Sequence, residues 1–177
     1  MSKPAMETAR ETATRKLTRE QRGGKFLTFF LAGEEYGLEI LKVQEIIGMM
    51  DITPVPRTPE YIRGVINLRG KVIPVMSLAR RFGVPDRDDT SLTCVIVIEL
   101  AREGGSITMG IVVDEVSEVI NINAEHIEAP PDLGGASGDS FLRGMGKVDG
   151  KVVILLDMAH VIDTDVAINC DITAEAM

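Results

Sequence analysis

An internal repeat constrains this 177-residue chain more than any other feature of its sequence. The segment 63–73, RGVINLRGKVI, matches 143–153, RGMGKVDGKVV, and the similarity continues into the residues that follow each segment. A second pair agrees, because 36–47 aligns with 109–120. Self-similarity of this kind indicates that one structural unit occurs twice. The change of offset between the two pairs predicts an insertion in the second copy, for which the Pro- and Gly-rich stretch 130–138 is the obvious place.

The sequence of each copy predicts a series of short strands. Runs of apolar, mostly β-branched residues are separated by turn signals, a pattern typical of strands and hairpins. Two short helical turns are expected at 77–82 and 157–162, since Ser77 and Asp157 are residue types that cap helix N-termini. The expected strands are 26–31, 36–40, 43–47, 65–68, 71–76, 92–100, 107–113, 116–122, 143–148 and 151–156.

These elements predict a mainly β fold built from two small barrels. Five antiparallel strands per copy can close into a barrel, which removes exposed sheet edges. A unit of ~65 residues buries little surface by itself, so the two barrels should pack together and leave a groove between them, a common place for a partner to bind. We therefore expect a domain over 25–163 made of two intertwined β-barrel halves, a flexible N-terminal tail over 1–24 and a loosely ordered C-terminal tail over 164–177.

Composition excludes several classes of protein. The chain has 19 basic and 27 acidic residues and a net charge of −8, which argues against binding to nucleic acid. No run of about 18 uncharged apolar residues is present, so direct membrane insertion is not expected. The N-terminus lacks the apolar segment of a signal peptide, and two cysteines make no disulfide framework. The expected location is the cytoplasm.

Residues that could carry catalysis are sparse. The two histidines, His126 and His160, are far apart, and the chain has no phosphate-binding loop, His-Glu-x-x-His motif or EF-hand spacing. There is no Cys/His pair and no serine in a nucleophile-elbow context. We therefore expect no enzyme activity, no cofactor and no metal site. The alternative is a small-molecule-binding or hydrolytic protein with a polar, acid-containing cleft between the barrels.

One turn breaks a local rule and marks a candidate functional residue. The second copy has the favoured hairpin turn Asp149-Gly150, and the aligned turn of the first copy is Arg69-Gly70. Arginine is a poor residue where φ is positive, and such conflicts concentrate at functional sites. A different turn type that tolerates arginine is the alternative. The segment 36–47 is a second candidate, because it holds more apolar residues than one strand face can bury, although all of them could belong to the core.

Three segments carry a family pattern. They are Asn67-Leu68-Arg69-Gly70-Lys71-Val72-Ile73-Pro74-Val75, then Glu35-Tyr36-Gly37 followed by Leu41-Lys42-Val43-Gln44-Glu45-Ile46, and Gly110-Ile111-Val112-Val113-Asp114. They resemble the CheW family, the coupling proteins of bacterial chemotaxis, and the resemblance covers roughly 25–163. It implies two five-stranded SH3-like barrels around a shared hydrophobic core, in agreement with the repeat.

The resemblance also implies a function. A CheW-like protein would be a cytoplasmic adaptor without enzyme activity, recruited to membrane-associated receptor arrays. It would join the cytoplasmic hairpin tips of chemoreceptors (methyl-accepting proteins) to the regulatory domain of the histidine kinase CheA. A related receptor pathway, such as pilus-based motility, is the alternative. The residues that the resemblance assigns to receptor binding are Leu27, Ile40, Val43, Glu45, Ile46, Arg69 and Val119.

Overall fold

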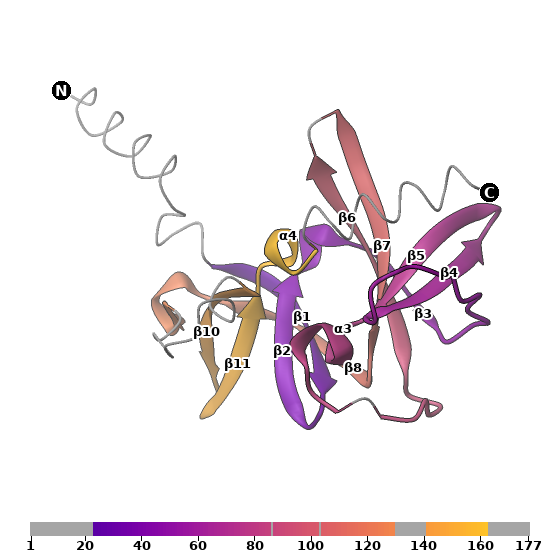
Figure 1. The fold of residues 1–177 in the computed structure, drawn as a ribbon. Helices are drawn as coiled ribbons and strands as arrows, with labels where there is room; N and C mark the ends of the chain where they lie inside the picture. The colour runs from indigo at the N-terminus through magenta and orange to yellow at the C-terminus, as the bar shows by residue number, and fades with distance from the viewer. Residues whose placement is uncertain (1–22, 86, 103, 130–140, 163–177) are drawn as a thin grey trace.

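The computed structural model describes residues 23–85, 87–102, 104–129 and 141–162, which form two β-sheets (Figure 1). The strands are β1 (Gly24–Leu31), β2 (Glu34–Glu39), β3 (Val43–Gly48), β4 (Ile62–Leu68), β5 (Lys71–Ser77), β6 (Cys94–Arg102), β7 (Gly105–Val113), β8 (Glu115–Ile122), β9 (Ile127–Glu128), β10 (Leu142–Val148) and β11 (Lys151–Leu156). The helical elements are η1 (Ile40–Lys42), α3 (Leu78–Phe82), η2 (Ala124–His126) and α4 (Met158–Val161). One sheet has the order β8-β1-β2-β11-β10-β9 and the other the order β3-β6-β7-β5-β4.

The two copies of the repeat exchange their first hairpins. Hairpin β1–β2 belongs to the first copy, yet β1 pairs with β8 and β2 with β11, both from the second copy. Hairpin β6–β7 of the second copy pairs in the same way with β3 and β5 of the first. The registers correspond, since Gly37 pairs with Leu155 and its repeat partner Gly110 pairs with Val75. Each sheet therefore combines both copies and contains one parallel pair, whereas we expected antiparallel pairing throughout.

The expected mainly β architecture is confirmed element by element. All ten expected strands appear, with ends displaced by at most three residues. The structure adds β9, whose place in the first copy is taken by the isolated bridge between Thr53 and Val65. Both helical turns begin where expected, because the side chain of Ser77 accepts a hydrogen bond from the backbone N–H of Arg80 and that of Asp157 from Ala159. The tail 164–177, nearly all of the tail 1–24 and the stretch 130–138 lie outside the described residues.

The largest apolar core joins the two sheets. It contains Leu27 and Phe29 from β1, Met76 from β5, Ile96 from β6 and Leu156 from β11, all almost fully buried. Two smaller cores lie within the five-stranded and six-stranded sheets. Since burying such a side chain stabilises a protein by roughly 1.5–3 kcal/mol, the shared core holds the sheets together as one body.

Arg81 of α3 lies at the seam, where the two copies of the repeat meet. Its guanidinium carbon lies 4.9 Å from the ring centroid of Tyr61 and 4.7 Å from that of Phe141, two residues at equivalent positions of the repeat. Its Nε donates a hydrogen bond of 2.9 Å to the carbonyl oxygen of Val161 in α4. The ring of Phe82 also lies 5.5 Å from that of Phe141. Cation–π and ring contacts therefore add directional attraction to an apolar seam.

Gly64 provides a test of this packing. Its φ is +146°, and a Cβ there would overlap the backbone of Thr53, which exchanges two hydrogen bonds of 2.9 Å with Val65. Gly64→Ala should lower the free energy of unfolding by roughly 2–3 kcal/mol, measured by urea denaturation. Gly48→Ala is the matched control, because its added Cβ would meet no atom within 4 Å. Equal stability of the two variants would contradict the close approach at Gly64.

Candidate partner-binding site

The edge strand β3 and the turn before it form one exposed surface. Along β3 the residues alternate between half-buried and exposed. Val43 therefore packs against the largest apolar core, which joins the two sheets, while Ile46 is 41% exposed. In η1, Ile40 also packs against that core and Leu41 is 90% exposed. This surface therefore combines apolar side chains that solvent reaches with others that the core holds in place.

Arg69 occupies a left-handed backbone position beside this surface. Its φ is +53° and that of Gly70 is +84°, close to +50° and +78° at Asp149-Gly150 in the second copy. The side-chain oxygen of Asn67 accepts a hydrogen bond of 2.8 Å from the Gly70 N–H, which supports the turn. The prediction of positive φ at Arg69 is confirmed, and the alternative, a turn type in which the arginine does not adopt positive φ, is excluded. A non-glycine residue in this region carries a local conformational cost.

The Arg69 guanidinium forms a fork on the carboxylate of Glu45. Its two terminal nitrogens donate hydrogen bonds of 2.6 and 2.9 Å to the two carboxylate oxygens. The Arg69 side chain remains 73% exposed and that of Glu45 25% exposed. An exposed pair of this kind adds little to stability, although the bidentate geometry orients the guanidinium plane.

The fork also fixes the charge state of both groups. The hydrogen bonds from Arg69 hold the pKa of the Glu45 carboxyl below its ordinary value, and those same bonds raise the pKa of Arg69. Because the carboxyl pKa is lowered, the ion pair is fully formed at pH values above the ordinary pKa of glutamate. It is lost only as the pH falls through the lowered pKa. Both charges are therefore present at neutral pH.

A shallow hollow adjoins the fork. Lys71 is among its lining residues and places its Nζ 3.4 Å from Oγ1 of Thr108 on β7. The full lining consists of Gln44, Glu45, Leu68, Arg69, Lys71 and Ile73, from β3, β4, β5 and the turn between β4 and β5. The hollow is open and of mixed character, which suits contact with another protein surface better than enclosure of a small molecule.

The structure brings five of the seven expected binding residues onto neighbouring elements. Glu45 and Arg69 are in direct contact, and Ile40, Val43 and Ile46 lie on η1 and β3 beside them.

The other two lie on the six-stranded sheet. Val119 on β8 is 50% exposed, and its register partner Leu27 on β1 is only 1% exposed. Leu27 is therefore part of the largest apolar core, and its side chain is not available at the surface. Sequence reasoning could not separate it from exposed strand residues, because a strand pattern alone does not show which faces are covered.

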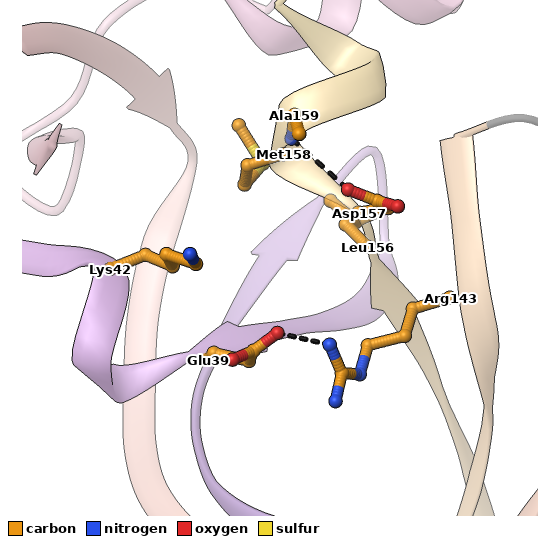
Figure 2. A pocket seen from close by; sticks show the side chains of 7 residues that line it. All are labelled: Glu39, Lys42, Arg143, Leu156, Asp157, Met158 and Ala159. Carbon is orange, nitrogen blue, oxygen red and sulfur yellow. Dashed lines mark hydrogen bonds and ion pairs between the residues drawn. The ribbon is translucent and has the colours of Figure 1, made fainter. Parts of the chain in front are cut away.

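Leu41 is a surface residue that the sequence analysis missed. We expected a strand through Ile40 and placed Leu41 between two strands, but η1 turns the chain and points Leu41 into solvent. Its neighbour Lys42 reaches toward a second hollow, where Glu39 of β2 forms an ion pair with Arg143 of β10 (Figure 2). Asp157, also in this hollow, caps α4. Both acids are thus held by neighbours of the same chain.

Residues 23–85, 87–102, 104–129 and 141–162 also bear on metal binding and membrane insertion. Among those residues, no group of three or more histidine, cysteine, aspartate or glutamate side chains is arranged to hold a metal ion. No helix there is both long and apolar enough to cross a bilayer.

Comparison with known proteins agrees with the fold. The family model of the CheW-like domain matches residues 25–166. The chemotaxis protein CheW of Klebsiella aerogenes is 37% identical over 150 residues, which cover 85% of this chain and 88% of that protein. The chemotaxis protein CheW of Rhizobium meliloti is 32% identical over 144 residues, covering 81% of this chain and 90% of that protein.

A solved structure shows the same architecture. The scaffolding protein TtCheW from Thermoanaerobacter tengcongensis superimposes with a TM-score of 0.72 at 38% sequence identity, covering 81% of this chain and 90% of that one. The family match and these relatives show that the chain belongs to the CheW-like family of chemotaxis scaffold proteins.

Proposed function

We propose that this scaffold couples the cytoplasmic tips of chemoreceptors to the histidine kinase CheA. The receptor hairpin docks on η1, β3 and the Arg69 turn, and the regulatory domain of the kinase contacts one of the two sheet units. The observation that supports this most directly is the adjacency of exposed apolar side chains on η1 and β3 and an oriented arginine on one open surface.

The chemistry of the surface suits a helical partner. An amphipathic helix can lay its apolar face on Ile46 and Leu41, in the manner of helix-in-groove recognition. Arg69 uses two terminal nitrogens for Glu45, and its remaining N–H donors face outward for a carboxylate or amide of the partner. Glu45 thus acts as a positioning residue for the arginine.

A binding role without catalysis accounts best for the acidic residues. In the second hollow, Glu39 is held by Arg143, and Asp157 accepts from Ala159 while it contacts His160. Both acids of this hollow are thus engaged by groups of the same chain, and on that ground we favour binding over hydrolysis. We propose no cofactor and no enzyme activity.

The protein would act in the cytoplasm, at the receptor arrays. An affinity near micromolar, about −8 kcal/mol, is sufficient where many weak contacts act together. The same surface would serve a related receptor pathway such as pilus-based motility, in which the receptor differs and the docking chemistry does not.

Reconstitution tests the coupling itself. Adding the full chain to a receptor signalling fragment and CheA should raise kinase autophosphorylation several-fold, measured by radiolabel incorporation. The kinase with the receptor fragment alone is the baseline. No stimulation with receptors of either the swimming or the pilus pathway would contradict the proposed role.

Replacement of Arg69 tests the fork. Arg69→Ala should weaken receptor co-sedimentation about tenfold while the urea midpoint of unfolding stays close to that of wild type, since the exposed pair adds little stability. Arg69→Lys should recover only part of the binding, because lysine lacks the planar fork. The control is Arg87→Ala, at an exposed arginine loosely paired with Asp114. Unchanged receptor binding in Arg69→Ala would remove this residue from the site.

A charge introduced on β3 tests the apolar part of the surface. Ile46→Asp should reduce receptor binding at least tenfold, because a carboxylate would be desolvated against the apolar face of the helix. Val152→Asp, at another exposed apolar strand position, is the matched control and should bind normally. Equal loss in both variants would point to a general effect of charge and argue against docking on β3.

A further inference from the structure

The turn that carries Arg69 is supported by a side chain of its own hairpin. Oδ1 of Asn67, at an exposed position near the end of β4, accepts a hydrogen bond of 2.8 Å from the backbone N–H of Gly70. A bond from a short polar side chain to the backbone a few residues on favours a local turn over other conformations. It therefore restricts the backbone around Arg69, whose φ of +53° is unfavourable for an arginine.

The second copy forms the same turn with different residues. Alignment of the repeat places Lys147 where Asn67 stands, and a lysine ammonium group donates hydrogen bonds but cannot accept one. Its Nζ lies 2.6 Å from Oε1 of Glu128 instead. Asp149 occupies the left-handed position there, which aspartate adopts more readily than arginine does. The asparagine therefore occurs in the copy whose turn residue is less suited to its conformation.

The position of the Arg69 guanidinium depends on the backbone of this turn. The fork on Glu45 joins the turn to β3, and the arginine side chain is 73% exposed. An exposed ion pair is weak, because holding two long side chains in one geometry costs entropy. A turn with a fixed backbone lowers that cost, since the arginine side chain then starts from one place and one direction.

We propose that Asn67 is a positioning residue for receptor binding. Its hydrogen bond to Gly70 holds the left-handed turn, and the turn holds the Arg69 guanidinium on Glu45 with its remaining N–H donors available to the partner. This inference rests on the proposed docking at the Arg69 turn and adds a residue that acts there without touching the receptor.

Replacement of Asn67 in the full chain tests the inference by receptor co-sedimentation. Asn67→Ala should weaken binding about threefold, as expected for the loss of one hydrogen bond, and leave the urea midpoint of unfolding close to that of wild type. Asn67→Asp keeps an oxygen acceptor and should restore most of the binding. Lys147→Ala, at the equivalent position of the second copy, is the matched control and should bind as wild type does. A loss in Asn67→Asp as large as in Asn67→Ala would overturn the role of the acceptor.

A double-mutant cycle separates an effect through Arg69 from a direct contact with the receptor. In an Arg69→Ala background, Asn67→Ala should cause no further loss of binding, because no guanidinium is left to position. Losses that multiply in the double variant would overturn the positioning role and assign Asn67 a contact of its own.

NMR titration of the Glu45 carboxyl measures the fork without any receptor. Hydrogen bonds from Arg69 lower the pKa of Glu45, so Arg69→Ala should raise that pKa toward its ordinary value, and Asn67→Ala should raise it part of the way. An unchanged Glu45 pKa in Asn67→Ala would overturn the inference. A raised pKa with receptor binding unchanged in both single variants would support the link between Asn67 and Arg69 and overturn the docking at this turn.

Discussion

The exchange of hairpins between the two copies is the constraint on which the rest of the structure depends. Neither copy completes a sheet alone, because β1–β2 is paired with the second copy and β6–β7 with the first. The parallel contacts are close: a Cβ on Gly110 would lie 3.4 Å from Val75, and one on Gly37 would lie 3.0 Å from Leu155. Surfaces on the two sheets are therefore held in a fixed relation, which is the physical requirement for a scaffold.

Much of this fold could be predicted from the sequence because local and repeated patterns agree. Strand positions follow from the spacing of apolar residues, and the turn at Arg69-Gly70 follows from its alignment with Asp149-Gly150. Which hairpins are exchanged could not be predicted, since a strand pattern shows that a face is buried and not which strand buries it. Leu27 illustrates the limit: it has the residue type of a binding position and lies in the core.

The features that escaped prediction share one cause. Leu41 is exposed because three residues form η1, and Arg81 is placed between Tyr61 and Phe141 because the two copies meet there. Both positions depend on tertiary geometry, which the spacing of residues in the sequence does not reveal. Their signal in the sequence was weak: an aliphatic residue beside a lysine in one case, and an arginine in a short helix in the other.

The repeat also shows why only one of two equivalent surfaces suits the proposed receptor contact. Alignment places Glu118 where Glu45 stands and Asp149 where Arg69 stands, and both turns have the same backbone conformation. Aspartate adopts positive φ more readily than arginine does, so the second copy has the lower local cost. The first copy carries the greater cost together with a charge pair that the second copy, with an acid at both positions, cannot form. Backbone strain therefore persists at this turn together with an oriented, solvent-exposed arginine. This combination indicates that the site is organised for the group that the arginine binds.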